Sequence, residues 1–344
     1  MRLIESSAPC MVDFRHNNEA LRRQVTASAL RGRNDMLKIV EVGPRDGLQN
    51  ETAVIPPDLK IAFVDALSLS GVCEIEASAF VSPRWVPQLA DAEEVFRSIS
   101  RTDGVIYSAL VPNERGLDRA IAARVDKVAV FTAASETFNR KNINTSTAGS
   151  IRRFLPVVRG AKSVGLTVRG YVSTAFWCAF EGRIPPAAVI SLVEKLFDIG
   201  VDEVSVSDTV GKATPEEVGR LLDRLLTRIP ADRIAMHFHD TYGRGVENVL
   251  TSRLYGIRIF DASVGGLGGC PYAPGATGNV ATEAVVKALE SKGVAVGVDL
   301  EKLAHARHLL DPFLVEDRRT MPEDGSPVCA ACEYSTGDVC CRRR

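Results

Sequence analysis

The sequence has no long apolar run, almost no net charge and few histidines. No apolar stretch reaches the roughly 18 residues that a membrane-spanning helix needs, and the N-terminus lacks the apolar core of a secretory signal. Lys and Arg total 42 against 43 Asp and Glu, giving a net charge of -1. Such a chain has no overall field to attract nucleic acid or a membrane surface, and an anionic substrate would need local basic groups. We therefore expect a cytoplasmic protein that binds neither nucleic acid nor a membrane.

The cysteines are unevenly distributed. Four of the eight are scattered through the chain, whereas Cys329, Cys332, Cys340 and Cys341 lie in the last residues. This spacing in a long chain without a secretory signal predicts free thiols rather than a disulfide framework. Zinc binding or redox sensing by the tail is an alternative, but its spacing matches no common zinc module.

Residues 36–314 carry the periodic sequence of a folded domain, with a segment lacking such a pattern on either side. Residues 1–35 are broken by small and basic residues and predict a flexible extension; Glu5, Asp13 and Glu19 argue against an acid-poor transit peptide. Residues 315–344 are polar and rich in turn formers, and predict a flexible Cys-rich tail.

Short β-branched runs alternate with amphipathic stretches eight times within this domain. The expected strands are 38–42, 73–77, 104–110, 127–131, 166–172, 202–207, 233–238 and 257–262. Each is followed by a stretch with helical spacing of its apolar residues, and 293–314 adds a short helical segment. Eight such units favour an α/β fold of the (β/α)8 TIM-barrel class over an open doubly wound sheet, which six units would form. Reactive residues should then follow the strands.

Two histidines near the end of the seventh strand form the strongest functional motif. Residues two apart on a strand project from the same face, so His237 and His239 can offer both imidazoles to one point. The alternative is that one lines the core and the other caps the strand. Asp46, in the Gly-Pro-Arg-Asp-Gly turn after the first strand, adds a hard oxygen ligand. This set suits Mg²⁺ or Mn²⁺ as a divalent cofactor, with Zn²⁺ and Fe²⁺ as alternatives.

Other strand-end residues suggest chemistry around that cation. Arg45 can stabilise negative charge on a substrate oxygen, although a buried salt bridge is the structural alternative. The glycine-rich stretch 263–272 can close over a pocket and carry Cys270 into it as a general acid or base. Asn279, at a helix start, can add an oxygen ligand. Further polar groups that can line the barrel mouth are Glu76, Asp208, Arg169 and Tyr171.

These motifs together resemble the 3-hydroxy-3-methylglutaryl-CoA lyase family, a branch of the metal-dependent lyase and aldolase barrels. The resemblance covers about residues 36–310 and rests on the segments 42–51, 80–88, 141–144, 168–172, 237–243 and 265–272. Within that superfamily, Gly-Gly-Leu-Gly-Gly-Cys-Pro-Tyr at 265–272 is highly specific.

The resemblance implies cleavage of 3-hydroxy-3-methylglutaryl-CoA to acetyl-CoA and acetoacetate by a homodimer. The implied metal ligands are Asp46, His237, His239 and Asn279, and the implied substrate-binding residues are Arg45, Gln49 and Arg169. Arg45 would stabilise the enolate of the departing acetyl-CoA and Cys270 would transfer a proton. The implied catalytic set also contains Asp46, His237, Glu76, Asp208 and Tyr171.

One departure from the family pattern opens an alternative substrate. The family usually has Leu-Gly-Cys-Pro-Tyr before Glu-Gly, whereas this chain has the bulkier Phe176 and Trp177 before Cys178. Near a pocket these rings would favour a related branched 3-hydroxyacyl-CoA. A synthase that condenses acetyl-CoA with a 2-oxo acid is a less favoured alternative, because such enzymes usually carry long extra domains. A barrel kept only as a binding module conflicts with the intact ligand motif.

Overall fold

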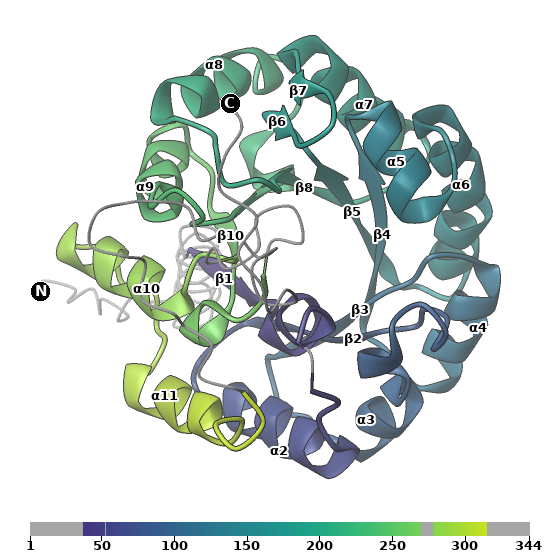
Figure 1. Ribbon diagram of the computed structural model, residues 1–344, viewed down its shortest axis with the longest axis vertical. Coiled ribbons are helices and arrows are strands. Elements are labelled where there is room, and N and C mark those ends of the chain that lie inside the picture. The colour runs from purple at the N-terminus through teal and green to yellow at the C-terminus, as the bar shows by residue number, and fades with distance from the viewer. Residues whose placement is uncertain (1–36, 52, 270–277, 315–344) are drawn as a thin grey trace, which may run out of the picture. The chain divides into compact units, whose positions relative to one another are not determined.

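The computed structural model describes residues 37–51, 53–269 and 278–314 (Figure 1). The predicted extension 1–35, the predicted tail 315–344 and Cys270 lie outside these ranges, so their proposed flexibility and roles stay predictions.

Eight parallel strands close into a barrel, as the count of strand–helix units predicted. The neighbour order is β1-β10-β9-β8-β5-β4-β3-β2. The bounds are β1 Lys38–Glu41, β2 Glu74–Ala79, β3 Ile106–Leu110, β4 Lys127–Ala133, β5 Thr167–Ser173, β8 Glu203–Asp208, β9 Ile234–Phe238 and β10 Ile259–Ala262. The open doubly wound sheet is therefore excluded.

Helices surround this barrel in the view of Figure 1. They are α2 Pro57–Ser68, α3 Ala92–Ser98, α4 Glu114–Ala122, α5 Glu136–Ile143, α6 Thr147–Ser163, α7 Pro186–Asp198, α8 Pro215–Leu225, α9 Gly245–Leu254, α10 Thr282–Ser291 and α11 Leu300–His308. The start of α8 shows why a helix begins at a particular residue. Thr214 accepts a hydrogen bond from the Glu217 backbone, and the Glu217 carboxylate accepts one from the Thr214 backbone, so both free amide groups are satisfied.

Among the α-helices and strands, one helix and one hairpin were not predicted. The first is α5, whose eight residues include few apolar ones; its signal was Ser135, which caps the helix by accepting from the Phe138 amide. The second is a small antiparallel hairpin, formed by β6 Trp177–Cys178 and β7 Gly182–Arg183, between β5 and α7. Its two-residue strands are too short to produce a periodic pattern.

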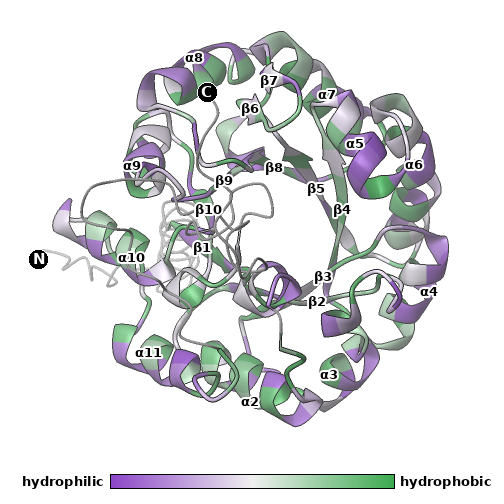
Figure 2. Cartoon of the chain, in the orientation of Figure 1, coloured by the Kyte–Doolittle hydropathy of each residue, from purple (hydrophilic) through white to green (hydrophobic). Residues whose placement is uncertain are grey.

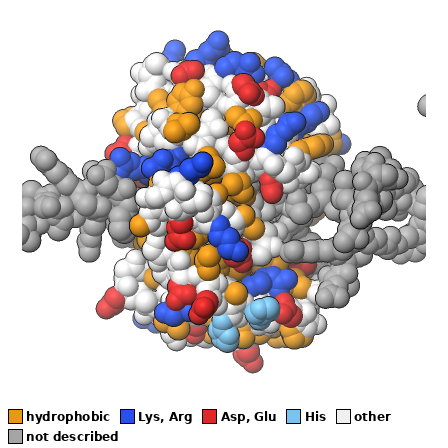
Figure 3. Space-filling model, turned by 90° about the vertical axis from the view of Figure 1, so that its left-hand side faces the viewer, with side chains coloured by type: hydrophobic (Ala, Val, Ile, Leu, Met, Phe, Trp, Pro, Cys, Tyr) orange, Lys and Arg blue, Asp and Glu red, His pale blue; other side chains and the backbone are white. Residues whose placement is uncertain are grey.

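Apolar side chains fill the space between the strands and the helices. In Figure 2 the strands are largely green, whereas the helices alternate between green and purple along their length. His305 and His308 are exposed on α11, and Figure 3 shows exposed histidines in pale blue among mixed acidic and basic side chains. Within the described ranges, Cys73 and Cys178 are free thiols, as predicted. None of the helices described here combines the length and apolarity needed to cross a membrane.

Inside the barrel, the first residues of four strands form a group of paired charges, which we call the base cluster: Lys38, Glu74, Lys127 and Glu203. The Glu74 carboxylate lies 2.5 Å from the Lys38 ammonium and 3.1 Å from that of Lys127, and Glu203 lies 2.9 Å from Lys127. Opposite charges thus offset one another at the amino ends of the strands.

Candidate metal centre

Asp46 lies in a single π-helical turn, Gly43–Gly47, directly after β1. The amides of Arg45, Asp46 and Gly47 all donate to the Val42 carbonyl, which makes the turn unusually wide. Single π-helical turns are rare and occur often at functional sites. This turn holds the Asp46 carboxylate at the carboxyl end of the barrel.

The two histidines and Asn279 reach the same point from β9 and from the segment that pairs just beyond its end. His237 lies on β9, and His239 follows it and pairs with Asn279 in an isolated bridge. Flanking backbone bonds join Asp240 to Gly278 and Val280 to Phe238, at 2.7 and 3.0 Å. Backbone pairing just beyond the end of β9 therefore positions Asn279 beside the second histidine.

Asp46, His237 and His239 form a candidate metal site. Each offers one ligand atom, and these atoms lie within 4.8 Å of one another. The fit is supported by two buried atoms that have no hydrogen-bond partner among the described residues, Nδ1 of His239 and Oδ1 of Asn279. Asn279 also donates from Nδ2 to the Asp46 carboxylate at 2.9 Å. One carboxylate, two imidazoles and an amide oxygen match the donors that divalent cations take.

The pKa shifts leave His239 and Asp46 in ligand form at neutral pH. Burial and, to a smaller extent, the neighbouring His237 lower the pKa of His239 to about 4, so this imidazole is neutral. Burial alone would raise the pKa of Asp46, but the Arg45 guanidinium and the two imidazoles hold it below its ordinary value. A neutral imidazole and an ionised carboxylate are the forms that bind metal.

Arg45 extends from the same turn into a group with Glu76 and Tyr171. Its guanidinium lies 2.5 Å from the Asp46 carboxylate and 2.6 Å from that of Glu76, and the Tyr171 hydroxyl donates to Glu76 at 3.1 Å. The guanidinium also lies 5.4 Å from the centre of the Tyr171 ring. The salt bridge weighed as the alternative for Arg45 is thus present, and it fixes the cation beside the candidate metal ligands.

Sequence reasoning missed Asp261, a buried residue of β10. Its carboxylate lies 3.3 Å from Nδ1 of His237, accepts from the Ser205 hydroxyl at 2.8 Å, and pairs with Arg169 at 2.5 Å. The bond to Nδ1 leaves Nε2 of His237 on the side of Asp46, 4.0 Å from its carboxylate. Carboxylates of this kind orient metal-binding imidazoles. The available signal was one acid inside the otherwise apolar end of a strand, Ile-Phe-Asp-Ala.

Arg169, predicted to bind substrate, is fully buried in this network. Besides Asp261, its guanidinium lies 3.3 Å from Glu203 and 5.0 Å from the centre of the Tyr171 ring. It therefore links the base cluster to the mouth of the barrel.

We call the π-helical turn Gly43–Gly47 the ligand turn. Two glycines let it contact the glycine-rich stretch directly. A Cβ at Gly47 would lie 2.8 Å from Cβ of Leu267, and one at Gly268 would lie 2.8 Å from Nδ2 of Asn279. Gly268 also has a φ of +105°, which disfavours side chains. Glu41 connects the same segments, because its carboxylate accepts from the amides of Gly43 and Val264 at 2.8 and 2.9 Å.

Asp208 and Gln49, two further predicted site residues, are less closely associated with the candidate metal ligands. In the register of β8 and β9, Asp208 shares a side with Phe238, whereas Ser207 shares a side with His237. The Asp208 carboxylate accepts from the Ala213 amide at 2.8 Å, and burial raises its pKa to about 6. Gln49 follows the ligand turn and is half-buried. The catalytic role of Asp208 and the substrate role of Gln49 stay predictions.

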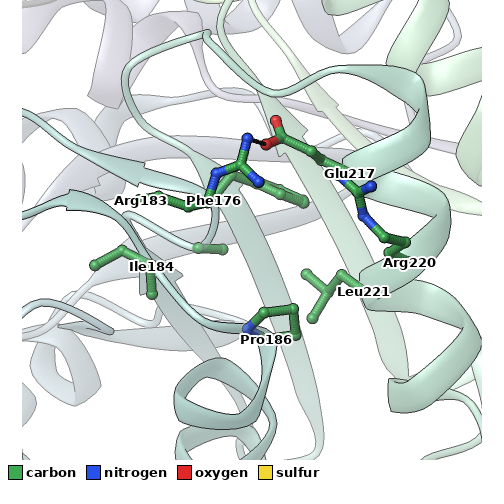
Figure 4. A pocket seen from close by; sticks show the side chains of 8 residues that line it. Phe176, Arg183, Ile184, Pro186, Glu217, Arg220 and Leu221 are labelled. Carbon is green, nitrogen blue, oxygen red and sulfur yellow. Dashed lines mark ion pairs between the residues drawn. The ribbon is translucent and has the colours of Figure 1, made fainter.

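The bulky residues Phe176 and Trp177 face α8. Figure 4 shows Phe176 in a pocket with Ile184, Pro186 and Leu221, and the remaining lining residues are Ala175, Arg183, Glu217 and Arg220. The Trp177 indole donates to the Glu217 carboxylate at 3.2 Å. The pocket lining contains none of the candidate metal ligands.

Comparisons with known proteins agree with this geometry. The HMGL-like family model matches residues 36–310. The chain is 44% identical to the mitochondrial hydroxymethylglutaryl-CoA lyase of Bos taurus, over 89% of this chain and 94% of the relative. It is 48% identical to a cytoplasmic 3-hydroxy-3-methylglutaryl-CoA lyase of Rattus norvegicus, over 81% and 82%.

A solved structure extends the likeness to three dimensions. An HMG-CoA lyase from Acinetobacter baumannii, in complex with coenzyme A and 3-methylmalate, is 38% identical with a TM-score of 0.78, covering 90% of this chain and 99% of that one. Barrel, ligand turn and paired histidines thus occur in a chain that matches these enzymes over most of its length: it belongs to the hydroxymethylglutaryl-CoA lyase family.

Proposed function

We propose that this chain is a divalent-metal-dependent carbon–carbon lyase that cleaves 3-hydroxy-3-methylglutaryl-CoA to acetyl-CoA and acetoacetate. The observation that carries the proposal is the convergence of Asp46, His237 and His239 beside Arg45 at the barrel mouth. Family membership favours this lyase over the condensing synthase.

The reaction is a retro-Claisen-type cleavage. The C3 hydroxyl loses its proton to a base, and its oxygen forms the carbonyl of acetoacetate as the C2–C3 bond breaks. The electron pair of that bond passes to C2 and gives the enolate of acetyl-CoA, which an acid then protonates. The site must therefore stabilise negative charge first on the C3 oxygen and then on the thioester oxygen.

We propose Asp46, His237, His239 and Asn279 as the ligands of Mg²⁺ or Mn²⁺. The bound cation would stabilise negative charge on the C3 oxygen. Asp261 would support this set by fixing the His237 ring, because its bond to Nδ1 selects the nitrogen that faces Asp46.

The positive group for the thioester oxygen is Arg45. Its contacts with Glu76 and the Tyr171 ring hold the guanidinium in place before substrate binds, so little reorganisation is needed during the reaction. Burial raises the pKa of Tyr171 well above its ordinary value, which keeps the phenol protonated as a hydrogen-bond donor. We propose the Cys270 thiol as the acid that protonates C2, with Gln49 and Arg169 in substrate binding and Asp208 in a supporting catalytic role.

The orientation of Phe176 and Trp177 supports the methylglutaryl substrate over a different branched acyl group. Their contacts lie with Glu217 and the pocket against α8, so their bulk occupies space outside the cluster of candidate metal ligands. We also propose a cytoplasmic homodimer; named relatives include both cytoplasmic and mitochondrial enzymes.

The test is steady-state cleavage by purified protein stripped with a chelator and then reloaded with Mg²⁺ or Mn²⁺. We expect acetoacetate release to vanish on stripping and to return on reloading. His237→Ala should lower both metal content and turnover. Cys270→Ala should keep the metal but lower turnover by about 10²- to 10⁴-fold. Unchanged cleavage by the stripped protein would contradict the metal-dependent mechanism. A strong preference for another branched thioester would mean that this thioester, and not 3-hydroxy-3-methylglutaryl-CoA, is the substrate.

A further inference from the structure

The pocket beside Phe176 lies between the β6–β7 hairpin, the start of α7 and α8 (Figure 4). Its apolar wall contains Phe176, Ile184, Pro186 and Leu221. Including its open side, the cavity measures about 330 Å³. This volume is at the lower end of the range for small-molecule sites, so it suits a ligand of roughly four to six carbon atoms rather than a coenzyme.

Backbone hydrogen bonds hold the apolar wall in position. The Ile184 amide donates to the Phe176 carbonyl at 2.9 Å, and the Ala175 amide donates to the Ser207 carbonyl of β8 at 3.0 Å. The side chains of Phe176 and Ile184 are buried. The pocket is therefore largely formed before a ligand binds, which lowers the entropic cost of binding.

Two arginines and one glutamate line the edge of the pocket. Figure 4 shows Arg183 on one side of Glu217 and Arg220 on the other. The Glu217 carboxylate pairs with Arg183 at 2.7 Å. It also accepts from the Trp177 indole at 3.2 Å and from the Thr214 amide at 3.1 Å. Both carboxylate oxygens are thus engaged, and the positive charge of Arg220 is not balanced by this glutamate.

Arg220 is the cation at this edge that is available to a ligand. Among the residues that the structure describes, no carboxylate oxygen lies within 4.0 Å of its guanidinium nitrogens. Glu216 of the same helix attracts it at longer range. Arg220 is exposed to solvent, and a planar guanidinium can hold a carboxylate through two parallel hydrogen bonds.

We propose that this pocket binds a small monocarboxylic acid with an apolar chain, its carboxylate on Arg220 and its chain against Phe176 and Leu221. The lining contains none of the candidate metal ligands, so this is a second site, and it does not depend on the proposed function. One negative charge matches the one unbalanced cation at the edge. Phe176 stands where the family pattern has a leucine, so the aromatic wall is a feature of this chain.

The experiment compares 4-methylpentanoate with the matched neutral probe 4-methylpentanamide. Both are titrated by ligand-observed NMR into protein stripped of metal with a chelator, so that the carboxylate cannot bind a metal ion instead. We expect a Kd on the order of 1 mM for the acid, given its few non-hydrogen atoms. The amide should bind roughly tenfold more weakly, since a hydrogen bond to a charged group is worth about that much. Acetate, which lacks the apolar chain, should not bind detectably.

Three variants test the parts of the pocket. Arg220→Gln should raise the Kd of the acid roughly tenfold and leave that of the amide unchanged. Arg224→Gln is the matched control and should change neither Kd, because Arg224 is exposed one turn further along α8 and does not line the pocket. Phe176→Leu reduces the apolar contact and should raise both Kd values about threefold.

Thermal unfolding gives a second readout and shows that each variant is folded. Excess acid should raise the Tm of the parent and of Arg224→Gln more than that of Arg220→Gln. Acid binding that is unchanged in Arg220→Gln, equal for acid and amide, or undetectable far above the expected Kd would overturn the proposal. Displacement of the acid by coenzyme A would also overturn it, because the acid would then occupy the acyl-CoA site. None of these measurements needs turnover, so this site and the lyase activity can fail separately.

Discussion

The two ends of the barrel interior handle buried charge differently. In the base cluster, Glu74 lies between two lysines, and although burial raises its pKa, Lys127 and Lys38 lower it to about 2. At the mouth, Glu41 accepts only from neutral donors among the described residues, and burial raises its pKa to about 8. Among the described residues, Oε1 of Glu74 at the base and one buried atom each of His239 and Asn279 at the mouth lack a hydrogen-bond partner. The base therefore balances its buried carboxylate with two lysines, whereas the mouth contains buried groups with no opposite charge beside them.

The largest effect should follow removal of the ligand carboxylate. Asp46→Ala removes the only acidic ligand of the candidate set, and a metal ion contributes several kcal/mol to transition-state stabilisation. We expect metal content to fall and kcat/KM per folded molecule to drop by about 10³-fold or more. The variant also loses the ion pair with Arg45, so a lower Tm is expected as well. Metal analysis, kinetics and thermal unfolding measure these quantities. Asp198→Ala, an exposed carboxylate at the end of α7, is the control; full activity of Asp46→Ala would remove the carboxylate from the site.

At the base, loss of a carboxylate should affect stability instead. Glu74→Ala leaves the buried Lys127 and the partly buried Lys38 without their shared partner, so the free energy of unfolding should fall by about 3–5 kcal/mol. Turnover per folded molecule should not change at a temperature where the variant is folded. Urea unfolding tests this. A decrease below about 1 kcal/mol would mean that the base charges behave as surface pairs.

The two glutamates should also respond oppositely to pH. The folded-state pKa of Glu41 is raised, so its contribution to stability is present below its unfolded pKa and is lost as pH rises toward about 8. Glu41→Gln should remove this loss, which is on the order of a few kcal/mol between pH 5 and 8. Glu74 has a lowered pKa, so its contribution is lost as pH falls toward about 2. Unfolding curves across pH measure both, and parallel pH profiles for parent and Glu41→Gln would refute the assignment.

The smallest effect concerns the orientation of one ligand. Asp261→Asn replaces the carboxylate that accepts from His237, and we expect metal affinity to fall by about 10- to 100-fold. Titration with Mn²⁺ gives the Kd. Ser205→Ala removes another partner of the same carboxylate and should change the Kd less. An equal loss in both variants would indicate that general packing, rather than the bond to His237, sets the affinity.

The sequence predicted the barrel because each strand and most helices have a clear apolar period. The strands begin and end within about two residues of the predictions. Helix α5 and the hairpin were missed because they are short and have little apolar period. The apolar period thus predicts the strands of the barrel and the longer helices that pack against it.

Site residues were predictable where reactive side chains lie at the end of a strand or directly after it. Asp46, His237 and His239 were found because parallel strands bring their carboxyl ends together. Asp261 and Glu41 were missed because each is a single acid within a strand, and its partners come from distant segments. Such residues are recognisable only when the strand register is known.

The close approach of Gly47 and Gly268 to their neighbours has a consequence for assigning function to related sequences. Neither residue carries a reactive group, yet an alanine at either position would push Leu267 or the Asn279 amide away from the ligand turn. A relative that keeps every proposed ligand but has a larger residue at one of these two places should be treated as inactive until assayed. Absence of a side chain is as informative here as the presence of a histidine.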